Sequence, residues 1–443
     1  MKAWVVTLNP QNFGAAHLVI SGVVVWVVGF WFLRMYEGPD TAGRVGFVLL
    51  VLVLILQSGS LHRQECWLLL YSATLGAALL IATIASSDPM YSAPRALTSC
   101  LLFGTSGIVA YRFVNVTERY ADEVLPSISA ALSAFLLVLL SGYLFGFGGF
   151  RSGGMGGFRL AAGINPNTAG FLAFTTVVWS LLSAFSKGYW RTYDRILFLL
   201  AITVAALSFS RSAWLALSVL FAFLTWVKLL RILVMGRFRT SLLVLWLAIS
   251  VAGIVLTFII LLFNAFLLEP TYLRHPIAQY LETRLSVNGD DNLSSRARAW
   301  GILLAEFRSN PLFGGVGWYN STRLLDQHPD VAASPHSLHV RLLSEVGLVG
   351  YISIIALPLL AILVAVKRTL NTVARNSKNP REHQFWGVVA GSLVAYFSAR
   401  EFFENTYMVS YLNFATMFAI VLIVISLRGF ALHHATPKPL VGR

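Results

Sequence analysis

Twelve long apolar segments constrain the fold of this 443-residue chain more than any other feature. Their centres lie near residues 25, 52, 76, 104, 135, 177, 202, 219, 253, 356, 392 and 418. Most are long enough to cross, as helices, a hydrocarbon core of about 30 Å, although those at 45–57 and 195–209 are short. With 57% hydrophobic and 12% charged residues, the composition excludes an ordinary soluble domain. The sequence predicts an all-α integral membrane protein with about 12 transmembrane helices.

One long hydrophilic segment interrupts this series of helices. We expect transmembrane helices 1–9 within residues 1–268 and a loop subdomain on the outer side within residues 269–344. Transmembrane helices 10–12 then occupy residues 345–430, and residues 431–443 form a short cytoplasmic tail.

The outer loop should contain short amphipathic helices of the kind that lie at a membrane interface. One is expected at 276–285 and a second at about 295–307, stopped by an Asn-Pro pair. The apolar face of the second helix is predicted to consist of Trp300, Leu304 and Phe307. A compact glycine-rich loop follows at 311–318.

The 33 basic residues orient the chain, because cytoplasmic loops carry an excess of lysine and arginine. With a cytoplasmic N-terminus, 19 of the 33 basic residues, including all six lysines, fall in inner loops, both termini are cytoplasmic, and the 14 outer basic residues are all arginines. The net charge is +14, and we expect the basic residues of the inner loops to bind anionic lipid headgroups. No nucleic-acid partner is expected. The outer arginines can bind phosphate through two parallel hydrogen bonds.

The segment 335–351 holds the strongest candidate for a reactive group. Ser334 is a good N-cap and Pro335 suits the first helical position, so we expect a helix to start here. One stripe of that helix would carry His336, Val340, Leu343, Gly347 and Gly350. The two glycines would let a lipid tail or another helix approach, and the positive end of the helix dipole would keep the imidazole neutral. A neutral imidazole can take a proton from a hydroxyl.

The same segment resembles the signature of the O-antigen ligase family. It reads His336-Ser337, nine residues, then Gly347-Leu348-Val349-Gly350-Tyr351, which is a full match. The superfamily also includes O-antigen polymerases and pilin oligosaccharyltransferases.

This resemblance implies glycosyl transfer at the periplasmic face of the bacterial inner membrane. The donor would be a glycan on undecaprenyl pyrophosphate and the acceptor a sugar hydroxyl of lipid A–core, with no nucleotide, cofactor or metal. His336 would be the general base, while Arg211 in the Ser-x-Ser-Arg turn and Arg284 in the long loop would bind pyrophosphate. A single displacement with one base predicts inversion at the anomeric carbon.

Several other residues are supporting candidates with open alternatives. They are Arg296, Arg298, His339, Arg341 and Arg159, the last on a glycine-rich segment at 146–168. Arg341 could instead form a structural pair with Glu345 at i, i+4. Arg211 could anchor lipid phosphate. The adjacent acidic residues at 290–291 read first as a turn and otherwise as a divalent-ion site.

Two other functions compete with ligation. An O-antigen or exopolysaccharide polymerase would use the same base and donor but extend a second lipid-linked glycan. A flippase or transporter would have a similar number of helices but would need charges and broken helices at mid-membrane. The concentration of arginine and histidine on one side favours the enzymes.

Overall fold

The computed structural model describes residues 63–84, 86, 88–119, 121–146, 160, 166–208, 210–234, 293–328, 331, 334–374, 380–401 and 414–430. Within these residues the chain is all-helical and has no β-strand, as predicted. The expected segments near residues 25, 52 and 253, and the helix at 276–285, lie outside the described residues.

The helices follow the apolar segments closely. Their bounds are α3 (Arg63–Ile84), α4 (Pro89–Arg119), α5 (Ala121–Leu144), α6 (Pro166–Lys187), α7 (Thr192–Ser208), α8 (Arg211–Val234), α11 (Leu293–Ser309), α12 (Ser321–Leu325), α13 (Leu338–Ala374), α14 (Pro380–Val394) and α16 (Phe414–Arg428). α14 continues directly into a π-helix, η2 (Ala395–Arg400). Six of the described helices (α3, α4, α5, α6, α8 and α13) are long and apolar enough to cross a membrane.

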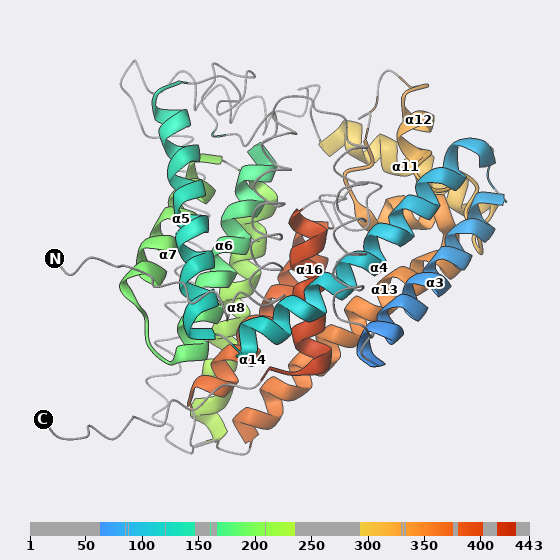
Figure 1. Cartoon of the computed structure of the whole chain (residues 1–443). Helices are drawn as coiled ribbons and strands as arrows, with labels where there is room; N and C mark the ends of the chain where they lie inside the picture. The colour runs from blue at the N-terminus through green and yellow to red at the C-terminus, as the bar shows by residue number, and fades with distance from the viewer. Residues whose placement is uncertain are drawn as a thin grey trace, which may run out of the picture.

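The outer surface of this bundle is apolar. Large side chains such as Leu101, Leu137, Leu199 and Leu359 are at least half exposed. In contrast, 83% of the residues in the apolar stretch of α6 are buried, whereas only 17% of those in the apolar stretch of α8 are. α6 is therefore the central helix, packed against α5, α7, α8, α14 and α16 (Figure 1). A water-soluble protein would bury such leucines, so the surface fits a lipid environment.

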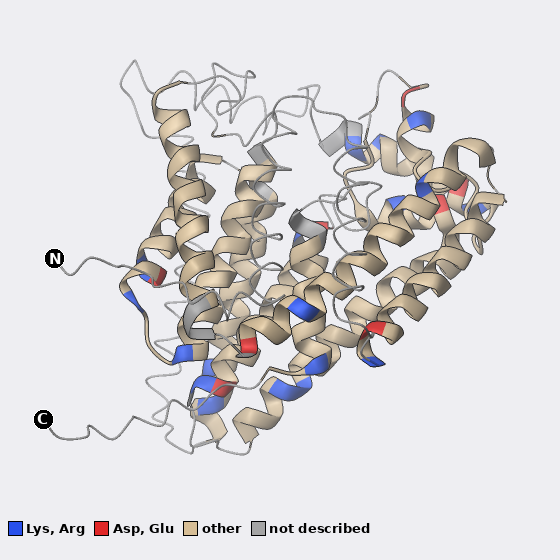
Figure 2. Ribbon diagram, viewed as in Figure 1, with Lys and Arg blue, Asp and Glu red and all other residues tan. Residues whose placement is uncertain are grey.

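The helices alternate in direction, and their termini gather at two opposite ends of the molecule (Figure 1). The ends of α6, α8 and α13 share one end with the starts of α7 and α14. We call it the lysine end, because Lys187, Lys228 and Lys367 lie in the second halves of α6, α8 and α13. Figure 2 shows basic residues gathered at this end. The Arg381 side chain donates to the Lys187 carbonyl at 3.2 Å, joining α14 to α6 at this end. The starts of α6, α8 and α13, with α11 and α12, form the opposite end, here called the site end. Which end faces the cytoplasm stays a prediction.

α11 confirms the helix predicted at 295–307, beginning two residues earlier and ending two residues later. Its buried face, however, consists of Ala299 and Leu303, which pack with Leu325 of α12. The predicted apolar face of Trp300, Leu304 and Phe307 is partly buried, so it is not the side by which α11 packs most tightly. A short alanine side chain lets the helix lie closer to its neighbours than a tryptophan face would allow.

Candidate functional site

Helix α13 begins at Leu338, two residues beyond His336, so the helix start expected at Pro335 is wrong. Ser337 caps the helix instead. Its Oγ accepts a hydrogen bond from the Val340 N–H at 3.5 Å, and its carbonyl oxygen accepts one from the N–H four residues on at 3.1 Å. His336 therefore lies just ahead of the helix and is not part of a helical stripe.

The backbone of His336 is held in an unusual conformation. Its φ of 45° lies in the left-handed region, which residues other than glycine rarely adopt. The His336 N–H points to Ser334 Oγ at 3.5 Å, and the Trp300 indole N–H donates to the Pro335 carbonyl oxygen at 2.6 Å. A contact from α11 thus holds Pro335, the residue directly before His336, whose imidazole is half-buried. Backbone outliers of this kind often mark functional sites.

α13 is a discontinuous helix. Gly347, with φ 62° and ψ −166°, separates a first stretch from the long apolar second stretch. The loop 311–316 fills this break. The Leu348 N–H donates to the Pro311 carbonyl at 2.9 Å, and the Val349 N–H donates to the Leu312 carbonyl at 3.1 Å. The N–H groups that open the second stretch are therefore satisfied by the loop, as a membrane-embedded break requires.

Two glycines allow the loop and the helix to touch through their backbones. A Cβ on Gly347 would lie 2.4 Å from the Gly314 nitrogen, and a Cβ on Gly314 would lie 2.6 Å from the Ser344 carbonyl oxygen. A Cβ on Gly350 would lie 2.4 Å from the Cβ of Val346 in the same helix. The expectation that Gly347 and Gly350 admit a lipid tail or another helix is wrong, because Gly347 admits the loop and Gly350 faces its own chain.

A buried ion pair lies in the first stretch of α13. Arg341 Nε donates to Glu345 Oε2 at 3.1 Å, and both side chains are almost fully buried. The other carboxylate oxygen, Glu345 Oε1, accepts from the Ser321 hydroxyl at 2.6 Å. The Arg341 guanidinium also lies 4.6 Å and 4.7 Å from the ring centroids of Trp318 and Tyr319. The structural pairing considered from the sequence is therefore confirmed.

His339 links three parts of the site end. Its Nε2 lies 3.2 Å from the Phe397 carbonyl oxygen on η2, and its Nδ1 lies 3.1 Å from the Tyr351 hydroxyl in the second stretch of α13. A carbonyl only accepts hydrogen bonds, so Nε2 carries the proton. His339 therefore connects the start of α13 across its break and to the π-helix.

A second buried ion pair was missed by the sequence reasoning. Arg400, the last residue of η2, lies 3.0 Å from Glu401 Oε1, and both side chains are almost fully buried. Its guanidinium lies 3.9 Å from the ring centroid of Phe171 on α6. The signal was present, because an Arg-Glu pair that ends an apolar run is costly in a membrane and usually functional.

Arg211 is the first residue of α8, in the tight turn that the sequence predicts after α7. Ser210 caps α8, with its Oγ 3.4 Å from the Ala213 N–H. α6 lies very close, since a Cβ on Gly170 would be 2.5 Å from the Ser210 Cβ. Arg211 therefore stands at a helix N-terminus, whose unpaired N–H groups favour anions.

The remaining candidates divide into two groups. Arg296 is half-buried and Arg298 exposed, both on α11 at the site end. Arg284 and Arg159 lie outside the described residues, as does the acidic pair at 290–291. Among the described residues there is no group of three histidine, cysteine or acidic side chains placed to bind one metal ion. His336, His339 and Arg341 thus lie around the start of α13 at the site end, and the start of α8 lies at the same end of the molecule.

Comparison with known protein families gives one match. The family model described as O-antigen ligase matches residues 196–355, which include Arg211 and the whole of the segment 335–351. No curated protein matches the chain significantly. The six described helices that are long and apolar enough to cross a membrane make the chain a multi-pass membrane protein, and the match relates its residues 196–355 to a membrane glycosyltransferase-like family. Residues 196–355 belong to the O-antigen ligase family, as the sequence signature predicts.

Proposed function

We propose that the chain is an O-antigen ligase of the bacterial inner membrane. It transfers a glycan from undecaprenyl pyrophosphate to a sugar hydroxyl of lipid A–core, with the site end facing the periplasm. The observation that carries the proposal is the family match over 196–355, which spans two residues at the same end of the molecule: Arg211 at the start of α8 and His336 just ahead of α13.

In the proposed reaction His336 takes the proton from the acceptor hydroxyl. Its place just ahead of the positive end of the α13 dipole favours the neutral imidazole that this step needs. The hydroxyl oxygen then attacks the anomeric carbon from the face opposite the pyrophosphate, and the bond from that carbon to the phosphate oxygen breaks. One displacement inverts the anomeric configuration.

The bond electrons leave with undecaprenyl pyrophosphate, so the site must stabilise negative charge on that group. We assign this role to Arg211, supported by the N-terminal N–H groups of α8, and to Arg284. The donor carries its own leaving group, so the reaction needs no nucleotide and no metal. Arg341 already binds Glu345 and lies against two rings, so we assign it to holding the start of α13.

Reconstitution tests the proposal directly. Purified protein with lipid-linked glycan and lipid A–core, without nucleotide or metal, should yield glycan on lipid A–core. Longer lipid-linked chains would instead identify a polymerase, and no product of either kind would reject the glycosyltransferase.

Two substitutions test the assigned roles. His336→Ala should abolish transfer while expression and donor levels stay normal, whereas His328→Ala, an exposed histidine at the same end, should leave transfer unchanged. Arg211→Lys should lose most activity, because an ammonium cannot make the two parallel hydrogen bonds of a guanidinium. Arg308→Lys on α11 is the matched control. Normal transfer by the His336 variant would remove the base assignment.

A further inference from the structure

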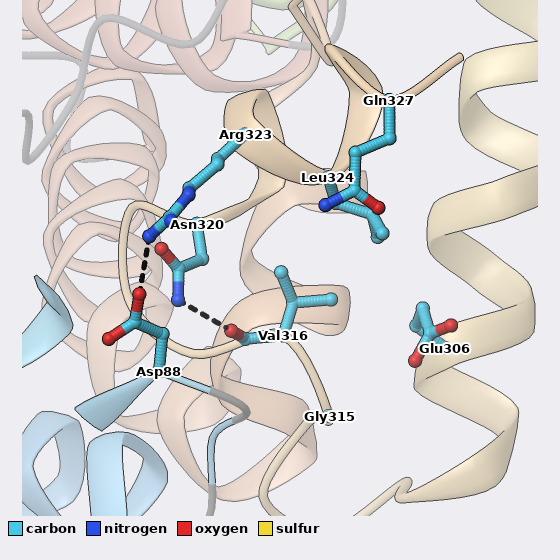
Figure 3. Close-up of a pocket in the computed structure, with 8 residues that line it drawn as sticks. All are labelled: Asp88, Glu306, Gly315, Val316, Asn320, Arg323, Leu324 and Gln327. Carbon is cyan, nitrogen blue, oxygen red and sulfur yellow. Dashed lines mark hydrogen bonds and ion pairs between the residues drawn. The ribbon is translucent and has the colours of Figure 1, made fainter.

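A pocket of about 420 Å³ opens at the site end, apart from His336 and Arg211. It lies between the α3–α4 turn, the end of α11, the loop 315–320 and α12 (Figure 3). Its polar lining consists of Asp88, Glu306, Asn320, Arg323 and Gln327. This volume falls within the range of roughly 300–1,000 Å³ that is usual for small-ligand sites.

The pocket presents both hydrogen-bond donors and acceptors on opposite walls. Figure 3 shows Glu306 on one wall and Asp88 with Arg323 on the other, and Asn320 beside them. The Asn320 side chain is 4% exposed and donates to the Val316 carbonyl at 3.1 Å, while its Oδ1 accepts no hydrogen bond. The lining groups that a ligand can reach are the Asp88 and Glu306 carboxylates, the Arg323 guanidinium and the Gln327 amide.

The backbone leaves space beside Glu306. Gly315 lines the pocket, and a Cβ at this position would lie 3.3 Å from Glu306 Oε2. Any larger residue would therefore crowd the carboxylate. The absence of a side chain keeps the Glu306 carboxylate accessible to a ligand.

The charges of the pocket disfavour a phosphate group. Asp88 and Glu306 contribute two carboxylates against the single guanidinium of Arg323, which is already paired with Asp88. A polyhydroxyl ligand suits this lining better, because each hydroxyl can donate to a carboxylate or amide oxygen and accept from a guanidinium or amide N–H.

The position of the pocket relates it to the acceptor. Asn320 precedes Ser321, whose hydroxyl binds Glu345, and Val316 N–H donates to the Ser344 carbonyl at 3.3 Å. The pocket therefore adjoins the first stretch of α13 from the side of α11 and α12. The first stretch of α13 also contacts η2, because His339 lies against the Phe397 carbonyl oxygen, and η2 packs against α8.

We propose that this pocket binds an uncharged sugar unit of the acceptor oligosaccharide, through its hydroxyl groups. The acceptor then approaches His336 from the α11–α12 side and the pyrophosphate donor from the α8–η2 side. This assignment rests on the proposed function for the identity of the acceptor, but the binding itself can be measured separately.

The test uses the full-length protein in detergent and a phosphate-free hexose oligosaccharide released from lipid A–core. Calorimetry should detect binding to the unaltered protein. Glu306→Ala and Gln327→Ala should each weaken it about fivefold or more, since each removes hydrogen bonds to the sugar. Arg308→Ala, two residues from Glu306 on α11, is the control and should bind normally.

Three outcomes would overturn the proposal: no binding to the unaltered protein, unchanged binding in both pocket variants, or displacement of the oligosaccharide by inorganic pyrophosphate. A pocket variant counts only if its melting curve matches that of the unaltered protein. One pocket variant that folds in this way is enough for the test. The measurement needs no donor, so oligosaccharide binding without any transfer would reject the proposed ligase reaction while leaving the sugar pocket supported.

Discussion

Replacing Gly347 by alanine should strongly destabilise the protein, because two separate costs meet at this residue. Its φ of 62° and ψ of −166° fall in a region open essentially only to glycine, so a side chain there costs about 1–3 kcal/mol. The added Cβ would also lie 2.4 Å from the Gly314 nitrogen and 2.5 Å from the Leu312 carbonyl group. These are backbone atoms, which cannot rotate away as a side chain would.

Overpacking of this kind typically costs about 1–3 kcal/mol, so the two terms together predict a loss of about 2–6 kcal/mol. The chain offers a matched control in Gly301, which lies within α11 and whose added Cβ would meet no atom within 4 Å. Gly301→Ala should stabilise the protein by about 0.5–1 kcal/mol, since alanine loses less backbone freedom in a helix.

Unfolding of the purified full-length protein in detergent measures both changes. Gly347→Ala should melt well below the unaltered protein and Gly301→Ala at or slightly above it. Gly314→Ala should resemble Gly347→Ala, because its Cβ would meet the helix backbone from the loop side. An unchanged melting curve for Gly347→Ala would refute the inference that α13 is broken there and filled by the loop.

Three further substitutions test the contacts around the site. Glu345→Ala should cost about 3–5 kcal/mol of stability, since it leaves the buried Arg341 without that carboxylate. Replacing both residues by apolar ones should recover most of this loss. If the double variant were as unstable as Glu345→Ala, the pairing would be refuted. Tyr351→Phe should cost only about 1 kcal/mol in the same unfolding assay, because it removes one hydrogen bond to His339. Gly170→Ala should lower the melting temperature by crowding the start of α8, with an expected cost of about 1–3 kcal/mol, and full stability would contradict the close approach of α6 and α8.

The spans and the family could be predicted from the sequence because both depend on local patterns. An apolar run such as 166–187 must be helical in lipid, since only a helix satisfies its backbone internally. The spacing of His336, Gly347 and Gly350 is likewise a linear feature, and the family match agrees with it.

The break in α13 was not predictable in the same way. A glycine within an apolar helix usually indicates close packing, and only the distant loop at 311–316 shows that Gly347 interrupts the helix instead. The helix start was misplaced for a similar reason, because Ser334 and Ser337 are both good caps and tertiary contacts decide between them. The sequence does show Arg400 and Glu401 at the end of an apolar run, but only the structure shows that both side chains are buried and paired.

The break at Gly347 explains how a membrane protein can hold a polar helix start beside an apolar span. The first stretch of α13 buries Arg341, Ser344 and Glu345, and these groups would be costly in contact with lipid. Because the helix is interrupted, this stretch need not follow the axis of the span and can direct its polar side chains toward α12 and η2. The position of His336 then depends on protein contacts at the site end and not on the tilt of the span in the bilayer. If His336 is the base that we propose, this independence would help it to meet two lipid-linked substrates, because bilayer thickness would not displace it.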